Sequence, residues 1–452
     1  MIKLQSIPEF QPHLPLFSIE DNFNVIYTQF QSSTLGKIYQ AIPWDELVKS
    51  FDLKESNKGP NCLFSPQGKL ALMFLKNYAC CSDERLIEQF NSNIHYQLFC
   101  RLVLRVGEQI DNFKIVSQIR CELAVKLNID DAQKCLAKYW LPYMEELEQM
   151  VTDATCYESS LRYPTDQKLL WEATDWCYKQ IKLLCKYGHL AIPRTKYKKW
   201  AHRYWNYSRK RRKPAKERVT ITRGLLRLLK KLLEELSVIT KLLNAQMPDK
   251  YYKQYAIIEK VRKQQKQKFT TGENPQNRIV SLSKSYIRPI VRGKETKAVE
   301  FGAKVNKIQI NGVSFIEHLN FNAFNEGVRF KSSIQLAQSL THTKLLLVGA
   351  DAIYATNANR KYASVNNIRT DFVRKGRAGK HEYQRKQMAQ MITKERATRL
   401  EGSFGKDKQH YYLSRIKART KGNEILWIFF GIHISNALEI GRRMQMPLTK
   451  AA

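Results

Sequence analysis

The chain has 452 residues, 43% of them hydrophobic, which indicates a globular protein with a sizeable core rather than a disordered chain. Its 76 Lys and Arg outnumber 41 Asp and Glu and leave a formal net charge of +35. Such an excess favours a polyanionic partner, and we expect nucleic acid rather than a membrane surface. The N-terminus lacks a signal-peptide pattern, the most apolar run (425–434) is too short to cross a bilayer, and nine scattered cysteines indicate reduced thiols.

The first third of the chain is predicted to be helical. Residues 1–60 mix short helical stretches with Pro-containing connections, and residues 61–145 are expected to form a helical DNA-binding or dimerisation domain. Ser65 followed by Pro66, and Ser82 further on, have the pattern of two helix N-termini. Helix, short turn and helix is the outline of a helix-turn-helix, although a small helical bundle fits the pattern equally well.

Residues 150–165 favour two short strands separated by a turn at Ser159-Ser160. Asp153 lies inside the first of these strands. A single Asp in a strand is more often an edge or turn residue than a catalytic one, so this position gains meaning only in combination with others.

Residues 166–275 return to a helical pattern and read as a basic insertion. Apolar residues recur every three or four positions from Leu225 to Leu243, a seam that we expect inside a helical hairpin, with a dimer zipper as the remote alternative. In the segment 194–218 Glu217 is the only acid, and aromatic residues alternate with basic ones. This pattern is typical of phosphate contacts with base stacking, and a solvated connector is the alternative. The aromatic candidates are Trp200, Tyr204, Trp205 and Tyr207, and the predicted DNA contacts are Arg209, Lys210, Arg211 and Arg212.

Strands are predicted again between residues 276 and 350. Asn311-Gly312 between two apolar runs is the strongest local signal for a two-residue hairpin, and a change of phase before it predicts a bulge near Asn306-Lys307. Leu345 to Val348 form a buried strand, Gly349 lets the backbone turn, and Asp351 follows at the carboxyl end. Catalytic groups often lie at that end of a strand in α/β folds, although many such aspartates are only caps.

The stretch from Glu401 to Arg419 places one acid before several bases. If it is helical throughout, Glu401, Lys408 and Arg415 share one stripe, because seven residues make almost two turns. Lys417 and Arg419 extend the basic surface, while a solvated, charge-alternating face is the alternative. Gly402 and Gly405 each cost a helix about 1 kcal/mol relative to Ala, which suggests that DNA or the sheet approaches there.

Asp153, Asp351 and Glu401 together suggest a metal site. Carboxylate oxygens are hard ligands that hold Mg²⁺ or Mn²⁺. Two such ions can stabilise the attacking and leaving oxygens of a phosphoryl transfer. The chain has no Gly-rich phosphate loop and no Ser–His arrangement of comparable coherence, so we expect no nucleotide cofactor.

Four stretches carry a resemblance to a known family: "VTDATCYESSLRYPTDQKLLWE", "RPIVRGK…VEFGAK", "LLLVGADAIYATNANRKY" and "RLEGSFGKDKQHYYLSRIKAR". They resemble the catalytic core of bacterial insertion-sequence DDE transposases, and residues 61–105 resemble the InsH-type domain that precedes that core. The resemblance implies an α/β, RNase H-like mixed sheet built from residues 146–165 and 276–445, with the helical segment 166–275 inserted.

The same resemblance implies a catalytic triad of Asp153, Asp351 and Glu401. Lys408, seven residues after the acid, matches the lysine of the family's signature. The arginine expected four residues before the acid is Ala397 here, with Arg396 beside it.

The activity implied is cleavage at terminal inverted repeats followed by joining of the freed 3′-hydroxyl to target DNA, with two Mg²⁺ or Mn²⁺ ions. A homodimer on double-stranded DNA in the bacterial cytoplasm, associated with the nucleoid, is the expected setting. Two alternatives remain: an inactive derivative that only binds DNA, and a metal-dependent nuclease of the same fold that performs no strand transfer.

Overall fold

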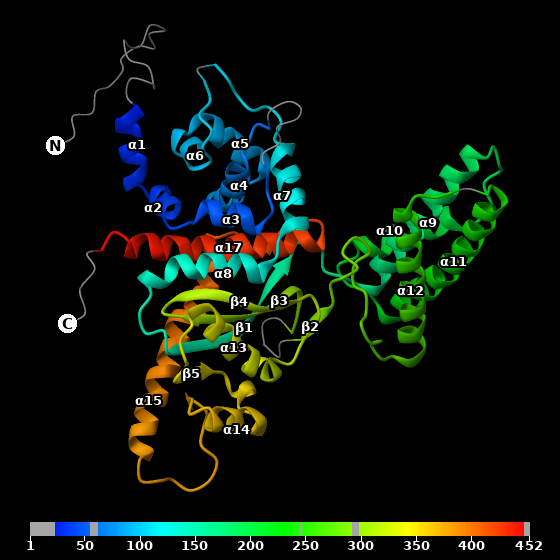
Figure 1. Ribbon diagram of the computed structural model, residues 1–452. Coiled ribbons are helices and arrows are strands. Elements are labelled where there is room, and N and C mark those ends of the chain that lie inside the picture. The colour runs from blue at the N-terminus through cyan, green and yellow to red at the C-terminus, as the bar shows by residue number, and fades with distance from the viewer. Residues whose placement is uncertain (1–22, 55–61, 106, 245, 292–297, 447–452) are drawn as a thin grey trace.

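The computed structural model describes residues 23–54, 62–105, 107–244, 246–291 and 298–446. It is a mixed α/β protein in which a curled sheet is covered by helices, while a separate group of helices projects to one side (Figure 1). The predictions for the chain before residue 23 and for the Gly-Lys pair at 293–294 lie outside the described residues.

Helices build the N-terminal part, as predicted. Within the described residues they are α1 (Phe23–Ser32), α2 (Thr34–Gln40), α3 (Trp44–Ser50), α4 (Pro66–Ala79), α5 (Asp83–Ser92), α6 (Ile94–Phe99), α7 (Lys114–Lys126), α8 (Ile129–Trp140) and the 3₁₀ turn η1 (Leu141–Tyr143). Ser65 accepts a hydrogen bond from Gly68 N and Ser82 from Arg85 N, both at 3.1 Å, so both predicted helix starts are confirmed.

The N-terminal helices pack on the rest of the protein through the last helix, α17 (Lys421–Arg443). Helix α17 contacts α2, α4 and α7 on one side and strand β4 (Val313–Asn320) on the other. Figure 1 shows α17, in red, lying between these helices and the sheet. Their apolar side chains therefore form one continuous hydrophobic core with the sheet.

Helix α5, the second helix of the possible helix-turn-helix, carries three acids, Asp83, Glu84 and Glu88, and one base, Arg85. Asp83 is paired with Lys76 and Arg120 at 2.7 Å. An acidic helix is poorly suited to the major groove, because each DNA phosphate repels it. The packing supports the helical-bundle interpretation that the sequence left open.

The sheet mixes antiparallel and parallel strands in the order β2-β3-β1-β5-β6, with β4 paired to β3 and β7 paired to β1. The neighbours β1–β3, β2–β3 and β3–β4 are antiparallel, and β1–β5, β5–β6 and β1–β7 are parallel. The remaining bounds are β1 (Gln149–Ser159), β2 (Pro289–Val291), β3 (Val299–Ile310), β5 (Leu347–Ala350), β6 (Arg369–Thr370) and β7 (Arg415–Ile416).

The structure confirms two sheet predictions and corrects a third. Asn311 and Gly312 have φ of 46° and 80° and join β3 to β4, and the register shifts between Asn306 and Lys307 as the bulge predicts. The expected turn at Ser159-Ser160 is wrong, because β1 continues through Ser159 by pairing with β7, and no second strand follows before the helix at residue 166. The strand partner supplied by β7 overrides the local turn signal.

Helices α9 (Asp166–Tyr187), α10 (Tyr197–Arg209), α11 (Ala215–Leu242) and α12 (Asp249–Thr271) form the projecting unit, shown in green in Figure 1. They have a hydrophobic core of their own. The leucine seam of α11 is buried from Leu225 to Ile239 and packs mainly on α9, which confirms the internal hairpin.

The remaining elements connect the strands and cover the sheet. They are η2 (Glu326–Arg329), α13 (Phe330–Thr341), η3 (Ala352–Tyr354), α14 (Asn357–Val365), α15 (Glu382–Glu395), the π-helical turn η4 (Arg396–Leu400) and α16 (Glu401–His410). The apolar run 425–434 lies in α17, where it is buried in the protein core. In the part of the chain that the structure covers, we find no helix whose length and apolar character would let it span a membrane.

Candidate active site

Asp153 and Asp351 lie at neighbouring positions of two adjacent parallel strands. The register pairs Thr152 of β1 with Ala350, the last residue of β5; Asp153 is the next residue of β1, and Asp351 directly follows β5. Adjacent strands are about 4.8 Å apart, so the two carboxyl groups start from neighbouring backbone positions. Asp351 also caps η3, since its Oδ1 accepts a hydrogen bond from Ala352 N at 2.7 Å.

The two carboxyl groups differ in environment. The pKa of Asp153 is raised to about 6, chiefly by burial and also by the neighbouring carboxylates of Glu326 and Asp351, against a hydrogen bond from Ala154 N at 2.7 Å. The side chain of Asp351 is 54% exposed. Asp153 is thus a half-buried carboxyl group beside the more accessible carboxyl group of Asp351. Such a pair attracts a cation when few positive groups of the protein balance its charge.

Arg396 joins Glu401 to the two aspartates. Its Nη1 lies 4.0 Å from Asp351 Oδ1 and 3.6 Å from Glu401 Oε1, and its charge also lowers the pKa of Asp153. The distance between Asp351 Oδ1 and Glu401 Oε1 is therefore at most the sum of these two distances. Asp351 and Glu401 thus flank one guanidinium group, whose charge also reaches Asp153 and whose Nε is buried without a hydrogen-bond partner.

The π-helical turn explains why Arg396, rather than Ala397, lies between Asp351 and Glu401. In an α-helix the residue four positions before Glu401 would share its face, whereas a π-turn bonds residues five apart and moves Arg396 onto that face. Single π-turns are found frequently at functional sites. The sequence spacing alone did not reveal it.

A small apolar cluster holds the helix that carries Glu401 against the sheet. Val151, Ile392, Leu400 and Phe404 are buried together. A Cβ built on Gly349 would lie 2.4 Å from Ile392 Cγ2, so the glycine is required for the close approach of α15 to β5. The expectation that Gly349 provides a turn is wrong, because it is an ordinary residue of β5.

Replacing Gly349 by Ala is expected to destabilise the protein by about 1–3 kcal/mol, since the added methyl overlaps a stiff β-branched side chain. The matched control is Gly402→Ala, where no atom lies within 4 Å of the new Cβ and helix propensity should raise stability by up to about 1 kcal/mol. Urea unfolding of both variants measures the difference. Equal unfolding free energies would contradict the packing role of Gly349.

A buried ionic network fixes α16 on the sheet below Glu401. Lys307 Nζ and Tyr157 Oη both lie 2.7 Å from Asp407 Oδ2, and Lys307 Nζ also donates to Ser403 Oγ at 3.1 Å. Lys307 and Tyr157 are fully buried, and burial lowers the pKa of Lys307 against the opposing effect of Asp407. The network ties three elements together, β1, β3 and α16, directly beneath the carboxylates.

Lys408 lies on the same face of the sheet as Asp153. Its Nζ donates to Thr155 Oγ1 at 3.1 Å, and Thr155 is two residues after Asp153 on β1. The stripe that was expected to continue to Arg415 is wrong, because α16 ends at His410, Tyr412 has a φ of 62°, and Arg415 belongs to β7. Arg415 Nη2 instead donates to Leu161 O at 2.9 Å.

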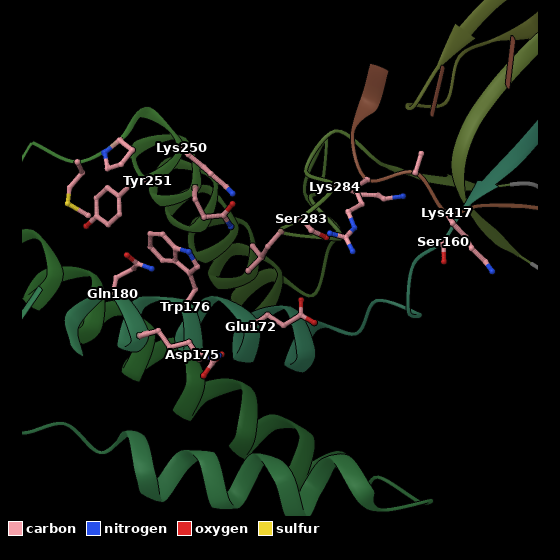
Figure 2. A pocket seen from close by; sticks show the side chains of 17 residues that line it. Ser160, Glu172, Asp175, Trp176, Gln180, Lys250, Tyr251, Ser283, Lys284 and Lys417 are labelled. Carbon is pink, nitrogen blue, oxygen red and sulfur yellow. The ribbon is translucent and has the colours of Figure 1, made fainter. Parts of the chain in front are cut away.

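Lys417 and Arg419 are exposed and line a cavity of about 1090 Å³ between β7 and the helical unit. Figure 2 shows Lys284 and Lys417 on one side of this cavity and Lys250 and Tyr251 on the other. Its lining has five Lys or Arg against two acids, Glu172 and Asp175. Asp175 is paired with Lys179 at 2.7 Å, and Lys284 is paired with the buried Glu424. The cavity is therefore a mainly basic passage that begins beside β7.

Arg209, Lys210, Arg211 and Arg212 are exposed at the connection between α10 and α11, as predicted, and Lys210 is paired with Glu217 at 2.8 Å. The structure does not bring this group to the carboxylates. The expected stacking surface is largely wrong: Tyr204 and Tyr207 are buried, Trp200 is half-buried against Gly224, and only Trp205 is 51% exposed. These aromatic rings pack the helical unit, for example Tyr204 on Trp171 with ring centres 4.9 Å apart.

Several residues near the acids were not predicted from the sequence. Asp371 follows β6 and accepts a hydrogen bond from Ala350 N at 3.1 Å, directly before Asp351. Lys307 and Asp407 form the supporting ion pair. A lysine in the interior of a predicted strand was the available signal for that pair, while the short strand β6 left none for Asp371.

The donor set fits a divalent cation by its chemistry, since three carboxylates and a raised Asp153 pKa require positive charge. Within the described residues, however, no three or more His, Cys, Asp or Glu side chains are grouped so as to hold a metal ion. Arg396 lies between two of the acids in this conformation. The guanidinium group would have to give way for the acids to share an ion.

The raised pKa of Asp153 predicts a pH-dependent stability. Because the folded-state pKa of about 6 lies above the usual 3.8, the folded protein holds this proton more tightly than the unfolded chain. The resulting stabilisation is complete below about pH 4 and is lost as the pH rises through 6. Asp153→Asn removes this effect, so its unfolding free energy relative to wild type should rise between about pH 4 and pH 7 in denaturant titrations without divalent ions. A difference independent of pH would contradict the assignment.

Comparisons with protein-family models, with curated proteins and with solved structures found no match. Function is therefore inferred from the chemistry and geometry of the residues described above.

Proposed function

We propose that the protein is a DDE transposase, which binds the terminal inverted repeats of an insertion sequence, cleaves the DNA there and joins the 3′-hydroxyl to target DNA. The observation that carries the proposal is the neighbouring pair of Asp153 on β1 and Asp351 at the end of β5, with Glu401 linked to Asp351 through Arg396, in a chain of charge +35. An acidic site in so basic a protein suits a metal-dependent reaction on a polyanion.

The sheet supports an RNase H-like interpretation of the fold. The strand order β4-β3-β1-β5-β6 has three antiparallel strands at one side and two strands parallel to β1 at the other. This is the order expected of an RNase H-like sheet, with the first aspartate on the central strand β1. The helical unit α9–α12 leaves the sheet after β1 and returns before β2, as expected of an insertion.

Asp153, Asp351 and Glu401 would hold two Mg²⁺ or Mn²⁺ ions, which would activate a water or hydroxyl and neutralise charge on the phosphate. The chain's own cations would orient the DNA: Lys408 beside Asp153, and Lys417 and Arg419 along the basic passage. The buried pair Lys307 and Asp407 keeps α16, and with it Glu401, in place. The reaction would use a homodimer on duplex DNA in the bacterial cytoplasm, near the nucleoid.

The test uses the purified full chain with plasmid DNA that carries its flanking inverted repeats. Strand cleavage at the repeat ends in Mg²⁺, and joined products with a second plasmid, are the expected results. No cleavage in Mg²⁺ or Mn²⁺, with intact binding to the repeats, would overturn the enzymatic proposal. Cleavage without any joined product would instead identify a nuclease of the same architecture.

One observation favours a second candidate, a DNA-binding derivative without catalysis. The guanidinium group of Arg396 already pairs with Asp351 and Glu401, so the negative charge of these acids is partly balanced by the protein itself. Calorimetric titration with Mn²⁺ separates the two candidates, because only a site that releases Arg396 takes up the ion. Absence of uptake at millimolar Mn²⁺ would favour the derivative.

A further inference from the structure

We propose that a second basic cavity, formed by α14, β6 and α15, binds the phosphate backbone of a duplex DNA segment distinct from the one beside Lys408 and Lys417. This inference rests on the proposed function for its choice of nucleic acid as the ligand. The cavity has a volume of about 790 Å³. Its lining includes four arginines and one histidine, named here the arginine pocket: Arg360, Arg369, Arg374, His381 and Arg385.

The charge of the arginine pocket is strongly unbalanced. Among the described residues, no Asp or Glu lines the cavity. Glu382 does not line the cavity but is paired with two of its arginines, Arg385 at 2.7 Å and Arg374 at 3.3 Å. The single carboxylate of Glu382 therefore holds two guanidinium groups in place, but it cannot balance the charge of all four arginines of the arginine pocket.

The guanidinium groups of Arg360, Arg374 and Arg385 are held in position before any ligand arrives. Arg360 Nε donates to Ala355 O at 3.1 Å, and its guanidinium lies 5.4 Å from the centre of the Phe372 ring. Arg385 Nη1 donates to Phe372 O at 3.3 Å. Planar guanidinium groups match the oxygens of a phosphate, and prior ordering lowers the entropy lost on binding.

The surrounding surface favours a polyanion over a single small anion. Between residues 369 and 386 the chain has seven Lys or Arg and two acids. Lys375, Arg377 and Lys380 are exposed beside the arginine pocket and extend its positive surface toward solvent. A row of cations reaching beyond one cavity matches the spacing of successive phosphates along a strand.

The strand register places the arginine pocket and the basic passage at two different positions around the acids. Strand β6 pairs with β5 through Arg369 and Leu347, two strand spacings of about 4.8 Å from β1. Asp371, directly after β6, accepts a hydrogen bond from the backbone N–H of Ala350, the residue before Asp351. Strand β7, which leads to Lys417, pairs with the far end of β1, at Glu158 and Ser159. DNA segments bound at the two basic regions would meet near Asp153 and Asp351.

The test compares Arg369→Gln/Arg374→Gln with a control of equal charge loss, Lys134→Gln/Lys138→Gln on the exposed face of α8. Fluorescence anisotropy in EDTA measures the affinity of each full-length variant for a duplex of unrelated sequence at several salt concentrations. Each lost phosphate contact lowers the slope of log K against log salt by about 0.9, so a decrease of up to about 1.8 is expected for the first variant only. Arg369→Lys/Arg374→Lys, which retains the charges, should restore most of the slope.

Equal slopes for both Gln variants would overturn the inference. Thermal stabilisation by inorganic phosphate that is lost in Arg369→Gln/Arg374→Gln, without a change in slope, would also overturn it by identifying a small-anion site. The binding assay needs no catalysis, so its result is independent of the cleavage assay. A reduced slope with an inactive wild type would leave the arginine pocket standing while the transposase proposal fails.

Discussion

Asp153→Asn is expected to lower the rate of Mg²⁺-dependent strand cleavage by at least about 10³-fold, while binding to the DNA ends changes little. A divalent ion supplies several kcal/mol of charge stabilisation, and each 1.4 kcal/mol corresponds to a factor of ten in rate. Asn keeps the size of Asp and can still accept the hydrogen bond from Ala154 N, but it lacks the negative charge. Gel assays of cleavage and of binding on the same labelled DNA measure the two effects separately.

Glu395→Gln is the matched control for this experiment. Glu395 lies on the same continuous helix as Glu401, 36% of its side chain is exposed, and it is paired with Arg399 at 3.1 Å rather than with the site. Its neutral variant should cleave at nearly the wild-type rate. Cleavage by Asp153→Asn at a comparable rate would remove Asp153 from the catalytic machinery.

Breaking the buried ion pair is expected to have the largest effect on stability. Asp407→Leu leaves the Lys307 ammonium group fully buried with only Ser403 Oγ as a partner, which costs about 3–5 kcal/mol of unfolding free energy. Lys307→Met should be costly for the same reason, because Asp407 keeps only Tyr157 as a partner. Urea unfolding at pH 7 measures both variants.

The double variant Lys307→Met/Asp407→Leu distinguishes an ion pair from simple packing. It buries no uncompensated charge, so its cost should be clearly smaller than the sum of the two single costs. The exposed pair of Lys230 and Glu234, 3.6 Å apart on α11, provides the control, and Lys230→Gln should change stability by less than about 0.5 kcal/mol. Additive costs at Lys307 and Asp407 would contradict the coupling.

Local sequence signals predicted those features that depend on neighbouring residues. The serine caps of α4 and α5, the Asn311-Gly312 hairpin and the bulge after Asn306 follow from turn and cap chemistry within a few residues, and all are confirmed. The buried seam of α11 also follows, because its period is contained in one helix. The strand that ends before Asp351 was predicted with a start two residues too early.

The same local signals failed where a distant segment decides the outcome. Tyr204 and Tyr207 have the pattern of a stacking surface, but Trp171 of another helix covers the first and both are buried. The stripe from Glu401 to Arg415 requires one straight helix, whereas β1 offers Arg415 a strand partner. Gly349 is needed for contact with Ile392, more than 40 residues away in sequence.

By itself, the sequence determined the charge of the protein, its mixture of helices and strands, and which three acids were candidates, because composition and local periodicity are properties of the chain alone. Only the tertiary structure decided that Asp153 and Asp351 are neighbours and that a π-helical turn places Arg396 between Asp351 and Glu401. It also decided that Lys307 and Asp407 hold the helix beneath them. Strand register, helix registry and the pairing of buried charges depend on contacts between residues far apart in the sequence, and no local pattern encodes them.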